Sequence, residues 1–125
     1  MNWPFWTLLA LVIVYVAYQQ WWLRRGVVHV SVHDIKGFLD ARQKFFLVDV
    51  REPKEFSGGH IPGAVNVPLS RLSENASGWS RDREIYVVCG SGQRSVLAAR
   101  RLMAMGFTKV ANVDGGLRRW PWATE

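Results

Sequence analysis

The segment VVCGSGQRSV, residues 87–96, contains the residues best suited to covalent chemistry. Cys89 is the single cysteine of the chain, and it directly follows an apolar run, residues 85–88. The loop that comes next consists of Gly90, Ser91, Gly92, Gln93, Arg94 and Ser95, after which a helical pattern begins. A thiol in such a place is either an inert core residue or a nucleophile, whose reactive form is the thiolate.

The composition of this loop favours an anion at its centre. Gly90 and Gly92 allow backbone conformations that other residues avoid, so successive N–H groups can point inward as an anion-binding nest. The positive end of the following helix faces the same space, and Arg94 adds a fixed charge with a planar set of donors. The anion is either the Cys89 thiolate, which a helix N-terminus and a nearby arginine both favour, or a bound oxyanion substrate.

Other site chemistries fit the sequence poorly. The loop lacks the G-x-x-x-x-G-K-[ST] pattern of a phosphate-binding P-loop. Zinc binding would require further cysteines or suitably spaced histidines, so we expect neither a metal nor a cofactor.

Apolar strands alternate with helices after residue 30. The predicted helices cover residues 31–42, 52–56, 69–74 and 95–105, and the predicted strands cover residues 44–50, 65–68, 85–89 and 109–115. Ser31 and Asp34 form an N-cap pattern, Gly106 is a C-cap candidate, and residues 114–116 are expected to turn into a final short helix. The alternation predicts an α/β fold, a small parallel sheet flanked by helices. Ligands bind such sheets at the carboxyl ends of strands, which is where Cys89 stands.

Residues 3–23 are predicted to form one transmembrane helix before this domain. The segment has no charged side chain and is about as long as a helix that crosses a bilayer, roughly 20 residues. Its aromatic residues gather near its two ends, as expected for side chains at the two membrane interfaces. A cleaved signal peptide is disfavoured, because no basic residue precedes the apolar run and no A-x-A-like site follows it.

Charge predicts the orientation of this anchor. Arg24 and Arg25 directly follow the apolar run, so the positive-inside rule places the N-terminus outside and the domain in the cytoplasm. Residues 1–25 are then the anchor with its basic flank, residues 24–28 a short linker, and residues 26–125 the domain. The net charge of +6 fits either attraction to anionic lipid or a solvated basic face. We find no nucleic-acid-binding module and expect no nucleic-acid partner.

Two segments, LVDVREPKEFSGGHIPGAVNVP and YVVCGSGQRSVLAARRLMAMGFTKVANVDGGLRRW, together resemble a single-domain rhodanese-like sulfurtransferase. The resemblance runs from about residue 31 to residue 120. Many members of that family have a loop of the form C-x-x-G-x-R, matched here by Cys89, Gly92 and Arg94. The resemblance implies that Cys89 takes sulfur from a sulfane-sulfur donor such as thiosulfate, becomes a persulfide and passes the sulfur to a thiol or other nucleophile. It also implies that the N–H groups of residues 90–95 cradle the persulfide, while Arg94 helps to hold the loop and the donor.

Loop length distinguishes this family from related phosphatases and arsenate reductases, which have a seven-residue C-x5-R loop. Here the spacing is C-x4-R, and Val88 replaces the histidine that precedes the cysteine in those phosphatases. Sulfur transfer is therefore favoured over phosphate hydrolysis. Gly90 stands where many rhodaneses carry arginine or another polar side chain, so the identity of the donor stays open.

Several polar residues outside the loop are candidates for supporting roles. Asp49 and Arg51 match the family pattern, and we expect them to form ion pairs near the active-site face rather than to act directly. His60 is a candidate general base, but its loop is mainly architectural in the family, and a reactive thiolate needs no base. His29 and His33 are expected to be surface or capping residues.

Two functions from different classes follow. The first is a membrane-anchored sulfurtransferase, whose thiol acceptor must be external because the chain has no second cysteine. The second is a rhodanese-fold binding module that recruits a membrane-associated protein partner with little turnover. In both, residues 3–23 contact the membrane.

Overall fold

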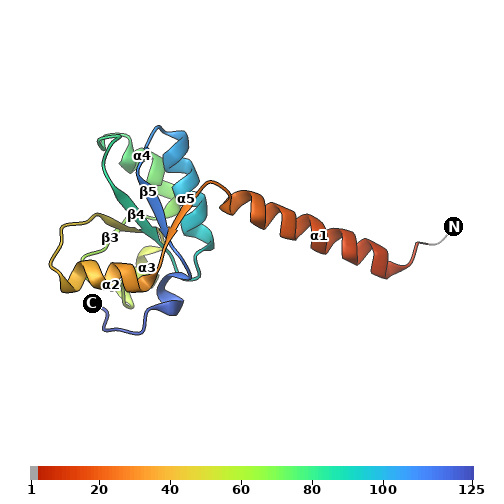
Figure 1. Ribbon diagram of the computed structural model, residues 1–125, viewed down its shortest axis with the longest axis horizontal. Coiled ribbons are helices and arrows are strands. Elements are labelled where there is room, and N and C mark those ends of the chain that lie inside the picture. The colour runs from red at the N-terminus through yellow and green to blue at the C-terminus, as the bar shows by residue number, and fades with distance from the viewer. Residues whose placement is uncertain (1–2) are drawn as a thin grey trace.

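The computed structural model describes residues 3–125 (Figure 1). Within them, a sheet is formed by β1 (Val28–Val30), β2 (Leu47–Asp49), β3 (Val65–Asn66), β4 (Ile85–Val88) and β5 (Val110–Val113). The strand order is β1-β5-β4-β2-β3, and every pairing is parallel. The predicted parallel sheet is confirmed, and its carboxyl edge carries the segment that begins at Cys89.

Helices cover both faces of this sheet. They are α2 (Val32–Asp40), α3 (Pro53–Ser57), α4 (Leu72–Ala76) and α5 (Gln93–Ala104), with 3₁₀ turns η1 (Leu69–Arg71) and η2 (Gly116–Arg119). On one face, Val87 of β4 packs in a cluster with Leu102 of α5; on the other, Val88 packs in a cluster with Ile35 of α2. β4 is therefore buried on both sides, which explains its uninterrupted apolar sequence.

The ends of helices α2 and α5 lie close to where the local sequence predicts them. Ser31 caps α2 as predicted: its Oγ accepts the N–H of Asp34 at 3.2 Å, and the Asp34 carboxylate accepts the N–H of Ser31 at 2.9 Å. Gly106, at φ +99°, follows α5 in the left-handed conformation expected after a helix. α5 begins at Gln93 rather than at Ser95, because Gly92 at φ +95° already ends the loop.

One predicted segment is wrong in part. Residues 24–28 were expected to be a linker, but β1 begins at Val28 and pairs with β5 in the register Val28–Ala111 and His29–Asn112. This strand is only three residues long, and its partner lies more than 80 residues further along the chain. Short edge strands of this kind are specified by their partner rather than by their own sequence.

The N-terminal helix α1 (Phe5–Arg24) extends away from the domain (Figure 1). Its apolar side chains are exposed along its length; Leu8, Ile13 and Trp21 have exposed fractions of 65%, 59% and 54%. By length and composition, Phe5–Trp22 is a candidate membrane span. The C-terminal end of α1 meets the domain, where Arg100 of α5 donates to the carbonyl of Trp22 at 2.5 Å.

Candidate active site

The Cys89 sulfur lies at the centre of the predicted loop. Cys89 is fully buried, and its Sγ accepts the N–H of Gly92 at 3.0 Å and the N–H of Ser95 at 3.4 Å. The Ser95 hydroxyl lies 3.3 Å from the same sulfur. Because Ser95 is in the first turn of α5, the positive end of that helix faces the sulfur. The loop therefore has the inward-pointing donors that stabilise a thiolate or a persulfide anion.

The loop itself is held by the turn that follows β5, a contact that the sequence analysis did not anticipate. The N–H groups of Leu117 and Arg118 donate to the carbonyls of Cys89 and Gly90, both at 2.9 Å. Gly116 lies directly against this backbone with φ +60°, and a Cβ there would approach the Cys89 carbonyl oxygen to 2.1 Å. The double glycine of residues 115–116 was the available signal, since a close approach between two backbones requires a residue without a side chain.

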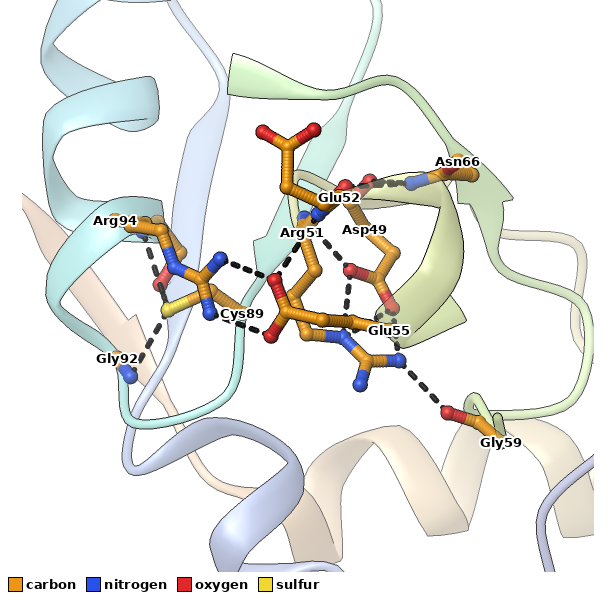
Figure 2. A network of polar contacts seen from close by, with 10 residues as sticks. Asp49, Arg51, Glu52, Glu55, Gly59, Asn66, Cys89, Gly92 and Arg94 are labelled. Carbon is orange, nitrogen blue, oxygen red and sulfur yellow. Dashed lines mark hydrogen bonds and ion pairs between the residues drawn. The ribbon is translucent and has the colours of Figure 1, made fainter. Parts of the chain in front are cut away.

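Arg94 is bound to a carboxylate from α3. Its two terminal nitrogens donate to the Glu55 oxygens at 2.6 and 2.9 Å. Figure 2 shows these two groups facing each other, with the Cys89 sulfur beside the guanidinium. The hydrogen bonds from Arg94 lower the pKa of Glu55 to about 2, and the same contact raises the pKa of Arg94. Arg94 therefore fastens the loop to α3, and its charge also interacts with Cys89.

Asp49 and Arg51 form the expected ion pair, which lies beside Glu55 (Figure 2). The Asp49 carboxylate accepts the Arg51 backbone N–H at 3.0 Å and also accepts from the guanidinium, with a shortest distance of 2.9 Å. Arg51 further donates to the Gly59 carbonyl at 2.8 Å, and the Asn66 amide donates to the carbonyls of Asp49 and Arg51. These contacts tie β2, β3 and the loop after α3 together. They set the position of α3, and thereby of Glu55, without touching the sulfur.

His60 lies in a structural setting. Its ring stacks on Phe56 with a centroid distance of 3.7 Å, and its Nδ1 lies 2.9 Å from the Phe56 carbonyl oxygen. Its Nε2 lies 3.6 Å from the Glu125 carboxylate, and its backbone pairs with that of Glu125. Both ring nitrogens are thus engaged with other groups, in keeping with the architectural reading of this loop.

The remaining loop residues divide by exposure. Gly92 and Ser95 are buried with the sulfur, Gly90 and Arg94 are half-buried, and Ser91 and Gln93 are exposed at the surface. Among residues 3–125, no group of three or more His, Cys, Asp and Glu side chains is placed to hold a metal ion.

Two further residues extend the site beneath the loop. The Ser95 hydroxyl donates to Oδ1 of Asn112 at 2.5 Å, and Nδ2 of Asn112 lies 3.1 Å from Nδ1 of His29. Asn112 is fully buried, whereas His29 is exposed on the edge strand. Asn112 was not predicted as a site residue, although a polar residue inside an apolar strand was a usable signal. His29 is a surface residue as expected, but it is also bonded to the site.

The end of α1 borders the site as well. Arg24 donates to the Asp114 carboxylate at 2.8 Å, which lowers the pKa of Asp114. Asp114 begins the turn that holds the Cys89 loop. A cavity of about 110 Å³ lies between Gln20 and Arg24 of α1 and the loop and first turns of α5, including Gly92 and Gln93. The Cys89 loop and the end of α1 are therefore neighbours.

The fold is a small α/β domain whose parallel sheet carries a cysteine-headed loop at its carboxyl edge. The model of the Rhodanese-like domain matches residues 31–121, so the chain belongs to that family. The matched range agrees with the extent of the resemblance seen in the sequence.

Individual relatives support this assignment. The chain is 38% identical over 100 residues to YrkF of Bacillus subtilis, covering 80% of this chain and 54% of YrkF. It is 35% identical to the thiosulfate sulfurtransferase GlpE of Shewanella oneidensis, covering 74% of this chain and 90% of that protein. Among solved structures, a rhodanese-like domain protein from Staphylococcus aureus superposes with a TM-score of 0.73 at 28% identity, covering 79% of this chain and 97% of the other. The chain thus spans little more than half the length of YrkF.

Proposed function

We propose that this protein is a membrane-anchored sulfurtransferase that carries sulfane sulfur as a persulfide on Cys89. The observation that carries the proposal is the cradle around the sulfur, formed by the N–H groups of Gly92 and Ser95 at the positive end of α5. The family supports the proposal, because a relative of which the chain covers 90% is a thiosulfate sulfurtransferase.

The reaction proceeds in two displacements on sulfur. The Cys89 thiolate attacks the sulfane sulfur of thiosulfate, a new S–S bond forms, and sulfite leaves with the electron pair of the bond that breaks. An acceptor thiolate then attacks the outer sulfur of the persulfide and releases the Cys89 thiolate. Each step moves one sulfur with no external oxidant or reductant, in the manner of covalent catalysis with two half-reactions. The loop N–H groups stabilise the anionic sulfur between the steps.

We propose that Arg94 chiefly holds the loop. Its guanidinium is committed to Glu55 by two short hydrogen bonds, so an anionic donor has to share or displace that carboxylate to reach it. The exposed side chains at the loop surface, Ser91 and Gln93, are the groups that we propose meet the donor first. The six-residue loop supports sulfur transfer over phosphate hydrolysis, because the related phosphatases use a loop one residue longer.

We further propose that α1 crosses the membrane, with the domain on the cytoplasmic side. The exposed apolar length of α1 and the arginines that follow it support this. The ion pair between Arg24 and Asp114 then holds the catalytic loop near the lipid surface. This position favours a thiol acceptor that is itself membrane-associated.

A test of this membrane placement uses cell fractionation. The full chain should stay with membranes after washing at high pH, and a chain lacking residues 1–25 should not. A protease added to intact spheroplasts should leave the domain uncut and should cut it once the membrane is opened. Release of the full chain by the wash, or cleavage in intact spheroplasts, would contradict the proposal.

The alternative is a binding module with little turnover, and the burial of Cys89 favours it, because the donor has to gain access to a covered sulfur. Thiocyanate formation from thiosulfate and cyanide separates the two functions. We expect turnover by the full chain and none by Cys89→Ser, while hydrolysis of an aryl phosphate stays at background in both. An inactive but folded protein would support the binding module, and Cys89-dependent phosphate hydrolysis would support a phosphatase.

A further inference from the structure

A chain of hydrogen bonds leads from Cys89 to the exposed ring of His29. It runs from Cys89 Sγ to the Ser95 hydroxyl (3.3 Å), from that hydroxyl to Asn112 Oδ1 (2.5 Å), and from Asn112 Nδ2 to His29 Nδ1 (3.1 Å). The four residues come from β1, β5, α5 and the end of β4. Because β1, β5 and β4 are consecutive strands of the sheet, the chain crosses the sheet from its edge to the reactive loop.

The orientation of the Asn112 amide sets the direction of the bonds in this chain. The amide nitrogen of Asn112 only donates, and His29 Nδ1 must accept from it with the ring proton on Nε2. The Ser95 hydroxyl has one proton, which it gives to Asn112 Oδ1. The contact between Ser95 and Cys89 then needs the S–H proton. The arrangement seen is therefore the one that suits the neutral thiol.

A thiolate and a persulfide both lack that proton, and they gain a third donor beside the N–H groups of Gly92 and Ser95 when the direction is reversed. In that direction Ser95 donates to the sulfur, and its oxygen accepts from Asn112. The Asn112 amide has to rotate by half a turn, placing Nδ2 toward Ser95 and Oδ1 toward His29. Oδ1 only accepts, so His29 must now carry a proton on Nδ1.

We propose that His29 and Asn112 form a relay whose direction reverses when Cys89 loses its proton or takes up sulfur, which makes His29 a positioning residue for the thiolate. The exposed ring exchanges its Nε2 proton with water, so the reversal needs only a proton shift on His29 and the rotation of one amide. Fully protonated His29 also carries Nδ1–H, so it favours the same direction.

Charged groups from neighbouring elements also face His29. Asp114, at the end of β5, interacts electrostatically with His29. Arg24 from α1 and Arg119 from η2 both pair with Asp114, at 2.8 and 3.6 Å. The positive charges of Arg24 and Arg119 offset the negative charge of Asp114. The hydrogen bond from Asn112 is therefore the contact that selects which nitrogen of His29 carries the proton.

The relay serves the Cys89 chemistry proposed above, but its test needs no sulfur donor. In ¹⁵N NMR of the full chain in detergent micelles, we expect the His29 proton to lie on Nε2 in the thiol form. As pH rises and the thiolate absorbance appears, it should move to Nδ1 at the same midpoint. His33, which packs edge-on against Trp122 and has no hydrogen bond to Ser95, Asn112 or His29 among the described residues, is the internal control and should show no coupled change of tautomer. A His29 ring that keeps its tautomer through the thiol titration would overturn the proposal.

Two substitutions at the exposed edge keep the test independent of folding. His29→Gln retains an amide that can donate or accept, so alkylation of Cys89 by iodoacetamide should stay within about twofold of the wild type. His29→Leu cannot donate to Asn112 and should slow alkylation below the midpoint by roughly 3- to 10-fold, the cost of one hydrogen bond. Equal rates for both variants would contradict the relay. If the two variants differ in alkylation rate as expected but no thiocyanate forms from thiosulfate and cyanide, the result counts against sulfur transfer and not against the relay.

Discussion

Replacing Gly116 with alanine should loosen the loop that holds Cys89, and two separate costs can be worked from the structure. The first is conformational. Gly116 has φ +60°, where a residue with a Cβ costs about 1–2 kcal/mol. The second is steric, because the new Cβ would lie 2.1 Å from the Cys89 carbonyl oxygen, well inside the 3.4 Å at which ordinary contact begins.

The steric cost falls on the bonds that fasten the loop. The two backbones must separate by roughly 1 Å, which stretches the 2.9 Å bonds from Leu117 to Cys89 and from Arg118 to Gly90 beyond useful length. Losing two such bonds costs about 1–3 kcal/mol. Together with the conformational cost, Gly116→Ala should lower the free energy of unfolding by about 2–5 kcal/mol.

Gly63→Ala is the matched control. Gly63 also has a positive φ, +84°, but nothing lies within 4 Å of its added Cβ, so only the conformational cost of about 1–2 kcal/mol applies. Urea unfolding of the full chain in micelles gives both values, and the iodoacetamide reaction rate reports access to Cys89. We expect Gly116→Ala to lose more stability than Gly63→Ala and to react faster. Equal losses with an unchanged rate would refute the claim that this turn holds the loop.

The remaining predictions concern the charged groups around the site. Asp49→Asn leaves the guanidinium of Arg51 buried without its carboxylate, so urea unfolding should show a loss of about 3–5 kcal/mol; a loss under 1 kcal/mol would contradict the structural role of this pair. Glu55→Gln frees Arg94 at a half-exposed site and should cost only about 0.2–1 kcal/mol at neutral pH. Because the pKa of Glu55 is lowered to about 2 from 4.5, its contribution is complete above pH 4.5 and disappears as pH falls toward 2, so the unfolding curves of variant and wild type should converge there; a constant gap would contradict the pairing. Burial, with a hydrogen bond to a carboxylate, raises the pKa of Tyr86 to about 12, so its neutral form stabilises the fold below pH 10 and this contribution is lost as pH rises toward 12. A spectrophotometric titration of Tyr86→Phe against wild type should remove a late-titrating phenol, and removal of a phenol that titrates near 10 would count against that burial.

The residues that could be predicted from the sequence are those whose signal is local. Residues 89–95 are contiguous, and their glycines, donors and helix start all indicate one anion-holding loop. Ser31 and Asp34 lie three residues apart, so their cap could also be recognised directly. In these places, each local preference agrees with the final fold.

The contacts that were missed join distant segments. Glu55 is 39 residues from Arg94, and the chain has ten acidic residues, so nothing local selects that partner. His29 and Asn112 are 83 residues apart and meet only because β1 pairs with β5. A three-residue strand carries too little pattern to predict that pairing, and the relay could not be seen without it.

The most direct test of the central claim is the intact mass of the full chain after incubation with thiosulfate, with Cys89→Ser treated in parallel. We expect the addition of one sulfur to the wild type, its absence from the variant, and its loss when cyanide or a thiol is added. A wild-type mass that stays unchanged with thiosulfate and with other sulfane-sulfur donors, or an added sulfur that persists in Cys89→Ser, would contradict a persulfide carried on Cys89.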